Sequence, residues 1–264
     1  MTAAPGAVSL APAPAPATPA SLLRLVLVPA WTAASIVAAL VARLVPDGGG
    51  LRRRVVRGWA RGVTRILRLR VERSGPPPSA PFLLVSNHLS YLDIIVLASE
   101  VDAVFVAKRE VRAWPLFGLG ARAIGCVFVD RDSRGDAVRA GALMRRRYAG
   151  GEGVVLFAEG TSSIGATVLP LRSALLEWAA SEGLAVHTAT LSYHTTPGDP
   201  PASEALCWWG EMTFLPHLAG VTRLNPSTVR LAFGDRAVSA SDRKQLARAL
   251  HAALLADFRP SGTP

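Results

Sequence analysis

The chain has 264 residues, of which 50% are hydrophobic, and a formal net charge of +10. This size suits one catalytic domain with an N-terminal addition. Its two cysteines, Cys126 and Cys207, are far apart in sequence, which excludes a disulfide framework or a cysteine zinc site and is typical of a reducing compartment. So basic a chain is expected to have an anionic partner, either a nucleic acid or a membrane.

The position of the charge distinguishes these two partners. Nine arginines and one acidic residue between Leu51 and Arg73 account for +8 of the +10. The rest of the chain is close to neutral, which argues against a broad groove for nucleic acid. Zinc-finger spacing and basic-region heptads are also absent from the sequence. We therefore expect a membrane partner and no nucleic acid.

The N-terminal part of the chain indicates a membrane anchor. Residues 1–20 are rich in alanine and proline and predict a disordered leader. Residues 25–42 then carry no charge, and as a helix they would span ~27 Å, just under the ~30 Å hydrocarbon core. This segment could cross the bilayer, lie within one leaflet, or form a buried core helix. A cleaved signal peptide fits less well, because only Arg24 precedes the segment while arginines follow it, a bias that keeps the domain cytoplasmic.

The arginine-rich stretch at 52–68 is amphipathic on a helical wheel. One face carries Val55, Val56, Trp59, Val63, Ile66 and Leu67, and the opposite face carries arginines. This pattern predicts a helix lying in an anionic membrane interface, and the alternative is a helix packed on the domain with a solvated face. The predicted membrane-binding residues are Arg53, Arg54, Arg57, Trp59, Arg61, Arg65 and Arg68. The anchor and this helix together occupy residues 21–73.

A catalytic domain is expected from residue 74 to residue 264. Short β-rich runs occur at 82–86, 103–107, 126–130, 154–158 and 185–193, with a further apolar run at 228–233. Helical stretches at 134–149, 171–182 and 241–258 alternate with them. This order predicts an α/β fold with a mostly parallel central sheet flanked by helices. In such sheets, sites form at the loops that leave the carboxyl ends of the strands.

The sequence "SNHLSYLDI" (86–94) places His88 at the end of the first of these strands and Asp93 five residues later. Five helical steps leave the two ~140° apart, so they meet only if His88 precedes the helix and Asp93 lies in its first turn. Ser90 and Asp93 have capping-box spacing, in which Asp93 merely satisfies backbone donors. The same geometry directs the carboxylate toward His88, where it can hold one ring nitrogen protonated and free the other for proton transfer.

The nucleophile for such a pair must come from elsewhere. The sequence has no G-x-S-x-G motif to supply a serine, so the histidine is expected to act as general base on a substrate hydroxyl. Three other strand ends bear on this site. "GCVFVDR" (125–131) ends in Asp130 and Arg131, "FAEGTSS" (157–163) contains Glu159, Gly160 and Thr161, and "VHTATLSY" (186–193) follows the third helix. Each sequence alone is equally compatible with an ordinary strand and turn.

Taken in order, His-x4-Asp, G-x-x-F-x-D-R and F-x-E-G-T resemble the glycerolipid acyltransferase family, of the lysophosphatidic-acid acyltransferase type. The resemblance runs from about Arg54 to the last helix. It implies that His88 deprotonates an acceptor hydroxyl, that Asp93 orients the ring, and that the hydroxyl attacks an acyl thioester. The implied donor is acyl-CoA or acyl carrier protein, with no further cofactor or metal. The implied acceptor-binding residues are Arg131, Glu159, Gly160, Thr161 and Ser162.

The chain departs from the family pattern in the third motif. Ala158 replaces a proline and Ser162 replaces an arginine. A serine hydroxyl does not replace the bidentate phosphate binding of a guanidinium group. The motif, with "WWGEMTFLPHL" (208–218), resembles the branch that acylates lyso-ornithine lipids, whose acceptor has no phosphate, although Ile164 stands where that branch often has aspartate.

We therefore expect a lysolipid O-acyltransferase at the bacterial inner membrane, with its catalytic domain on the cytoplasmic side. Lyso-ornithine lipid is the leading acceptor and lysophosphatidic acid is the second. A catalytically inactive membrane-surface protein is the alternative of another class.

Overall fold

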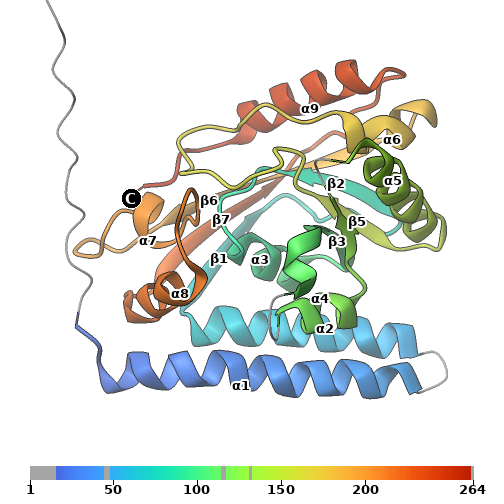
Figure 1. The fold of residues 1–264 in the computed structure, drawn as a ribbon. Helices are drawn as coiled ribbons and strands as arrows, with labels where there is room; N and C mark the ends of the chain where they lie inside the picture. The colour runs from blue at the N-terminus through green and yellow to red at the C-terminus, as the bar shows by residue number, and fades with distance from the viewer. Residues whose placement is uncertain (1–15, 45–47, 114–116, 131–132, 263–264) are drawn as a thin grey trace, which may run out of the picture.

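The computed structural model describes residues 16–44, 48–113, 117–130 and 133–262. Its centre is a seven-stranded sheet of order β1-β7-β6-β2-β5-β3-β4, parallel except for the antiparallel pair β6–β7 (Figure 1). The strands are β1 (Leu69–Ser74), β2 (Phe82–Ser86), β3 (Ala103–Lys108), β4 (Val127–Val129), β5 (Gly153–Leu156), β6 (Val186–His194) and β7 (Ser227–Phe233). The predicted fold class is confirmed.

Helices cover both faces of this sheet. The α-helices are α1 (Pro19–Val41), α2 (Gly48–Ile66), α3 (Leu92–Glu100), α4 (Phe117–Ile124), α5 (Arg134–Ala149), α6 (Glu177–Ser181), α7 (Ala202–Ala205), α8 (Phe214–Arg223) and α9 (Arg243–Asp257). Short 3-10 helices lie at Ala42–Leu44 (η1), Arg109–Ala113 (η2) and Ala174–Leu176 (η3).

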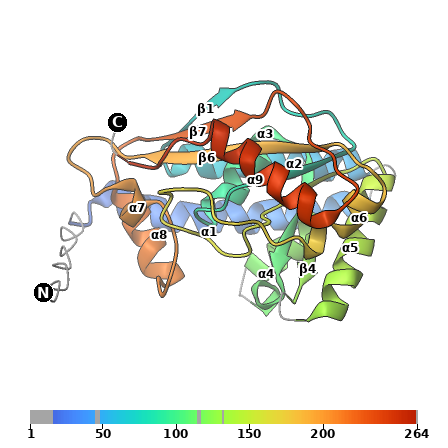
Figure 2. The same ribbon diagram turned by 90° about the horizontal axis from the view of Figure 1, so that it is seen from above.

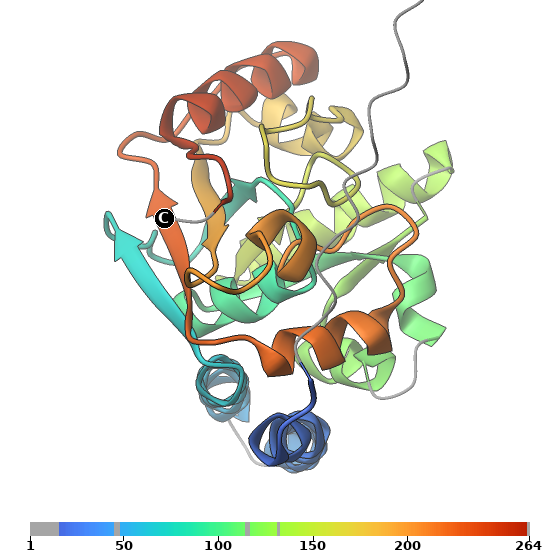
Figure 3. The ribbon, with the colours of Figure 1, turned by 90° about the vertical axis from the view of Figure 1, so that its left-hand side faces the viewer.

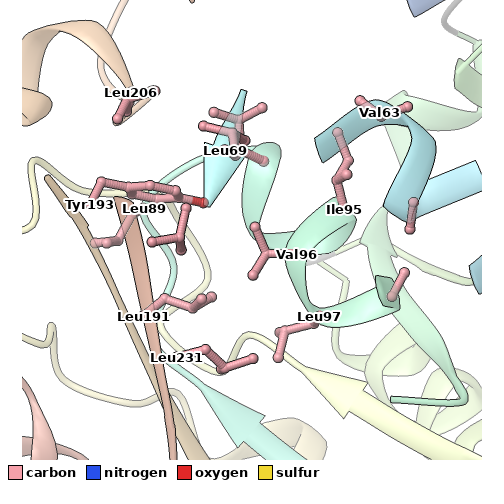
Figure 4. Close-up of a cluster of buried hydrophobic side chains, with 14 of the residues drawn as sticks. Val63, Leu69, Leu89, Ile95, Val96, Leu97, Leu191, Tyr193, Leu206 and Leu231 are labelled. Carbon is pink, nitrogen blue, oxygen red and sulfur yellow. The ribbon is translucent and has the colours of Figure 1, made fainter. Parts of the chain in front are cut away.

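The strands supply two separate cores. All of β2 is buried, and its side chains alternate between the faces: Leu84 packs in the core with α2, α3 and α8, whereas Leu83 and Val85 pack in the core with α5, α6 and α9. Figure 4 shows the first of these cores, where the Tyr193 ring lies beside Leu89. Continuous apolar strands of this kind are typical of a parallel sheet covered on both sides.

The N-terminal helices α1 and α2 form an antiparallel hairpin along the α3 side of the domain. Seen end on, α2 lies next to the domain and α1 lies outside it (Figure 3). The indole N–H of Trp31 donates to the Trp59 carbonyl at 3.1 Å, and the indole N–H of Trp59 donates to Thr32 Oγ1 at 3.1 Å. These two hydrogen bonds join the helices near their middle.

The packing of α2 corrects the prediction that its apolar face lies in a membrane. Ala60, Val63 and Leu67 are buried, and Trp59 packs against the same core. The domain itself, together with α1, therefore covers this face, as in the alternative of a helix packed on the domain. Arginines of the opposite face stay exposed at positions 54, 61, 65 and 68, while Arg53 pairs with Asp102 at 2.8 Å.

Helix α1 has the reverse pattern, because its apolar side chains face outward. Its buried stripe is narrow and partly polar: Ser21, Val28, Thr32, Ile36 and Ala39. The exposed large side chains are Leu22, Leu23, Val26, Leu27, Trp31, Val37, Leu40 and Val41. One helix, Pro19–Leu44, is long and apolar enough to cross a membrane, and 28% of its most apolar window is buried. An exposed apolar surface this continuous marks a contact with lipid or protein.

Two arginines hold the ends of α1 to the domain. Arg24 donates to the Thr222 carbonyl at 2.8 Å, near the C-terminal end of α8, and Arg43 donates to the Arg122 carbonyl at 2.9 Å, near the end of α4. Cations at helix C-termini satisfy free carbonyls and oppose the negative end of the helix dipole. The helix is thus fixed along the domain instead of projecting from it.

Three smaller differences from the prediction concern boundaries. The helix expected at 171–182 is reduced to η3 and α6, and residues 171–173 are not helical. Residues 69–73, grouped with the N-terminal helices in the prediction, belong to β1 and pair with β7. Helix α1 begins at Pro19, within the expected leader, of which residues 1–15 lie outside the described residues.

The hairpin contact can be tested at Gly62. A Cβ at this position would lie 2.1 Å from Trp31 Nε1, so Gly62→Ala must displace the indole and break its hydrogen bond to Trp59. Gly58 on the same helix has no atom near its Cβ position, so Gly58→Ala should stabilise α2 by up to ~1 kcal/mol. We expect a lower thermal unfolding midpoint for Gly62→Ala than for Gly58→Ala in detergent. Equal midpoints would contradict the packing described here.

Candidate active site

The loop after β2 begins with a side chain that extends the sheet. Asn87 donates from Nδ2 to the Leu191 carbonyl at 2.9 Å and accepts the Leu191 N–H on Oδ1 at 2.7 Å. The amide thus pairs with β6 one residue beyond the end of β2, as a further peptide group would. This double contact fixes where the next residue, His88, leaves the sheet.

His88 and Asp93 meet as the sequence predicted. His88 lies in the loop before α3, Asp93 lies in the first turn of α3, and Nδ1 of the ring is 2.7 Å from Asp93 Oδ2. The imidazole stacks on Phe157, with ring centroids 4.2 Å apart. Because a carboxylate oxygen only accepts, Nδ1 carries the proton in the neutral ring and Nε2 has a free lone pair. The His88 side chain is 17% exposed, so its ring can be reached from outside.

The Asp93 carboxylate is fully buried and accepts four hydrogen bonds. Oδ2 takes the backbone N–H groups of Leu89 (2.7 Å) and Ser90 (2.9 Å) besides His88, and Oδ1 takes the Tyr193 hydroxyl at 2.6 Å. The bond from Ser90 is one half of the predicted capping box. The other half is not formed, since Ser90 Oγ has no hydrogen-bond partner among the residues that the structure describes. Helix capping and orientation of His88 are therefore performed by the same oxygen.

Tyr193 was missed by the sequence analysis. It is fully buried in β6, and its backbone N–H donates to Ser261 Oγ at 3.1 Å while its carbonyl accepts from Gly262. The sequence analysis placed it only within the β-rich run at 185–193. The structure shows that its hydroxyl donates the fourth hydrogen bond to the Asp93 carboxylate, although the two residues are 100 positions apart in sequence.

Glu159, predicted to bind the acceptor, faces the backbone of the loop between β2 and α3 that carries His88. Its Oε1 accepts the His88 N–H at 3.0 Å, Oε2 has no hydrogen-bond partner in the described structure, and the residue is 3% exposed. Burial, with a smaller contribution from Asp93, raises the pKa of Glu159 to about 8, although the N–H groups of His88 and Leu169 oppose this. The geometry therefore gives Glu159 a positioning role behind His88.

The loop after Glu159 turns toward the surface. Gly160 has φ +79°, and a Cβ there would lie 2.7 Å from Arg172 Nε, so a larger residue would displace that arginine. Arg172 is exposed and lies over the loop. Thr161 is exposed beside it. Arg131, the remaining predicted acceptor residue, lies outside the described residues.

Ser162 connects this loop to a second segment. Its hydroxyl donates to the Trp208 carbonyl, and the Trp208 N–H donates to the Leu89 carbonyl at 2.8 Å. The Ser163 N–H in turn donates to the His88 carbonyl at 3.0 Å. The backbone of Trp208 therefore ties together the loops that carry the first and third motifs, a contact that sequence spacing could not show.

A half-buried histidine, His217, holds the segment around Trp208 in place. His217 Nε2 faces the Cys207 carbonyl at 3.0 Å and its Nδ1 faces the Tyr91 hydroxyl at 3.1 Å. Burial lowers the pKa of His217 to about 4, so the ring is neutral at physiological pH, donating to Cys207 and accepting from Tyr91. No three His, Cys, Asp or Glu side chains among the described residues gather as a metal site.

An apolar cavity of about 100 Å³ lies beside the first turn of α3. Ile94, which follows Asp93, lines it together with side chains from α1, α2 and α4, among them Ile36, Val55 and Trp59.

The arginines at positions 53, 54, 57, 61, 65 and 68 lie on or directly after α2 and are not part of the His88 site.

The raised pKa of Glu159 predicts how stability depends on pH. Between about pH 4.5 and 8 the unfolded chain has an ionised carboxylate, whereas the folded chain retains the proton, so this group makes stability fall as pH rises. Glu159→Gln removes the titration and keeps an acceptor for the His88 N–H. We expect the thermal midpoint of the variant, relative to the unsubstituted chain, to increase from pH 5 to pH 8. A difference that is constant or decreases would contradict a buried neutral Glu159.

Comparison with known proteins agrees with this geometry. The family model described as Acyltransferase matches residues 68–192. A lyso-ornithine lipid O-acyltransferase from Brucella abortus is 35% identical over 76% of this chain and 80% of its own. A 1-acyl-sn-glycerol-3-phosphate acyltransferase from Neisseria meningitidis is 31% identical over 71% of this chain and 74% of its own.

A solved structure shows the same fold. The 1-acyl-sn-glycerophosphate acyltransferase PlsC from Thermotoga maritima superposes with a TM-score of 0.61 at 19% identity, covering 89% of this chain and 96% of its own.

The match to the family model begins at Arg68 and includes the His88–Asp93 pair, the Glu159 loop and most of β6 with its backbone link to Asn87. The chain is a member of the acyltransferase family and an acyltransferase enzyme.

Proposed function

We propose that the protein transfers a fatty acyl group from a thioester, carried by coenzyme A or acyl carrier protein, to the hydroxyl of lyso-ornithine lipid. The observation that carries the chemistry is the His88 ring, held by buried Asp93 through Nδ1 and free at Nε2. A side chain so arranged is a general base that needs an external hydroxyl. An inactive binding protein of the same fold would not need a buried carboxylate that accepts four hydrogen bonds behind an accessible imidazole.

The reaction follows from this arrangement. His88 Nε2 takes the proton of the acceptor hydroxyl as its oxygen attacks the thioester carbonyl carbon. The C–O bond forms, the tetrahedral intermediate collapses, and the C–S bond breaks. The proton on Nε2 then passes to the leaving thiolate, so that ester and thiol are the products and His88 is neutral again. Asp93 stabilises the transient imidazolium and keeps the ring in the reactive tautomer.

The acceptor preference rests on the loop at 159–162. Ser162 stands where the family pattern has arginine, and its hydroxyl is engaged by Trp208, so this position offers a phosphate neither charge nor a free proton. An ornithine head group requires no such cation. The relative from Brucella abortus, named as a lyso-ornithine lipid O-acyltransferase, also supports this acceptor.

Lysophosphatidic acid is the second candidate acceptor, and Arg172 is the observation in its favour. This exposed arginine lies over Gly160 and could supply the charge that position 162 lacks. The Neisseria meningitidis relative carries the corresponding name. The two acceptors therefore have to be distinguished by experiment.

Attachment to the bacterial inner membrane through α1 fits this substrate. The outward face of α1 is apolar, and Arg24 and Arg43 hold both of its ends against the domain. A helix fixed in this way would lie in the cytoplasmic leaflet, where a lysolipid can reach the site without leaving the membrane. The apolar cavity beside Ile94 gives space for part of a hydrocarbon chain.

The role of Tyr193 gives a test of the catalytic pair. Tyr193→Phe removes one hydrogen bond from a buried carboxylate, which should reduce kcat about tenfold to a hundredfold with little change in acceptor KM. His88→Ala should remove the general base and reduce kcat by about 10²–10⁴-fold. Tyr148→Phe on α5, which loses a hydroxyl far from Asp93, is the matched control and should be fully active. Unchanged turnover in the His88 variant would refute the mechanism.

The acceptor assignment is tested by competition in one assay. We expect wild-type protein to prefer lyso-ornithine lipid over lysophosphatidic acid in kcat/KM, and Ser162→Arg to shift the ratio toward the phosphate acceptor. Because Ser162→Arg also removes the bond to Trp208, Ser162→Ala is measured beside it and should lower both activities without changing the ratio. A wild-type preference for lysophosphatidic acid would leave the acyltransferase standing and exclude the ornithine-lipid acceptor.

A further inference from the structure

Strand β4 forms one rim of the sheet, and a groove of about 310 Å³ follows its outer edge. In Figure 2, β4 lies at the rim between α4 and α5. One side of the groove carries Arg109 and Arg112 from η2, and the other carries Arg139 and Arg147 from α5. Resting on the function proposed above, we propose that this groove binds the phosphate groups of the carrier that delivers the acyl thioester.

The positive charge in the groove is only partly neutralised. Arg109 donates one N–H to Asp130 at 3.1 Å, and Arg147 pairs with Glu152 at 3.1 Å. Arg112 has no ion pair or hydrogen bond from its side chain within the described parts of the chain, and it is exposed. A guanidinium group has five N–H donors in a planar fork, so these arginines retain donors for an anion.

The fourth arginine, Arg139, is held by two protein partners. Arg139 Nε pairs with Asp136 at 2.6 Å and Nη2 donates to the Phe128 carbonyl of the edge strand β4 at 2.7 Å. The hydrogen bond from Arg139, with one from the Asp130 N–H, lowers the pKa of Asp136 to about 2, so Asp136 stays ionised and offsets one positive charge. The groove thus presents the Arg139 guanidinium on one side and, on the other, Arg112, whose side chain has no partner among the described residues.

The spacing on α5 makes one continuous wall. Asp136, Arg139, Leu143 and Arg147 lie three or four residues apart and share one helical face. Val127, Leu143 and other apolar groups form the rest of the lining. Apolar walls exclude water and strengthen charge-assisted hydrogen bonds to an anion.

The position of the groove favours the donor over a membrane lipid. None of its described lining residues belongs to α1 or α2, the helices on the proposed membrane side. A second arginine-containing cavity, lined by Arg52, Arg53 and Arg57, does lie on α2, but at the amino ends of β3 and β5, away from His88. The β4 groove opens instead at the sheet rim, where a water-soluble carrier can approach.

The distance to the catalytic histidine also suits a carrier. Arg109 follows β3 directly, at the same edge of the sheet as His88, and β4 is three strands from β2, about 14 Å at ~4.8 Å per strand. Coenzyme A and the prosthetic arm of acyl carrier protein both join a phosphate to the thioester sulfur through a long flexible chain. A phosphate held at the rim would leave that chain free to reach His88.

The experiment compares three donors with the full-length protein in detergent: palmitoyl-CoA, palmitoyl-acyl carrier protein, and the phosphate-free palmitoyl thioester of N-acetylcysteamine. Arg109→Gln/Arg112→Gln should raise the donor KM about tenfold or more for palmitoyl-CoA, and high salt should reduce the difference. The same variant should leave the phosphate-free donor and the acceptor KM unchanged. Arg145→Gln/Arg146→Gln, on α5 but outside the groove, removes the same two charges and is the charge-matched control.

Each outcome decides between defined alternatives. A loss for both carriers, or for palmitoyl-CoA alone, supports phosphate binding in the groove. Unchanged donor KM overturns the proposal, as does a loss restricted to acyl carrier protein, which would indicate contact with its acidic surface. Weaker binding to anionic vesicles with unchanged donor KM would assign the arginines to lipid head groups instead. Absence of transfer by wild-type protein from all three donors would refute the proposed function itself, not the groove.

Discussion

The buried carboxylate of Asp93 is the contact on which the site depends. A carboxylate removed from water is costly unless its oxygens are hydrogen bonded, and here the loop at 88–90 supplies three donors and β6 supplies the fourth. Each donor comes from an element whose position the others help to fix. Loss of any one would therefore disturb the helix start and the orientation of His88 together.

Further hydrogen bonds support the residues on either side of His88. Asn87 continues the sheet by one residue, Glu159 receives the His88 N–H, and the Trp208 backbone joins the two motif loops. These contacts are made largely by backbone groups or by buried side chains with fixed partners. Such support would keep His88 in place before substrate binds, as its proposed role as general base requires.

Much of this could be predicted from the sequence. The turn of 100° per residue required His88 to precede α3 and Asp93 to lie in its first turn, and the structure has that arrangement. Helix α5 begins and ends where predicted, because Ser133 caps it and arginines occupy its last turn. Features of this kind depend on residues that are close together in sequence, so they can be predicted without knowledge of the fold.

The contacts that were missed are non-local. The role of Tyr193 becomes visible only when β6 lies beside β2 and brings its hydroxyl to Asp93. The hydrogen bond from Ser162 to Trp208 joins segments that are 46 residues apart. The apolar face of α2, including Trp59, suits a membrane or a protein core equally well, and only the packed domain shows that it is covered. Periodicity identifies an apolar face but does not identify what covers it.

The tautomer of His88 tests the central claim most directly. Nitrogen-15 NMR of the full-length protein, with His88 assigned by comparison with His88→Ala, distinguishes a protonated Nδ1 from a protonated Nε2 in the neutral ring. The hydrogen bond to Asp93 predicts a protonated Nδ1 and an unprotonated Nε2, and Asp93→Asn should weaken this preference. A neutral ring protonated on Nε2 in the unsubstituted protein would contradict its role as the base that accepts a proton from the acceptor hydroxyl.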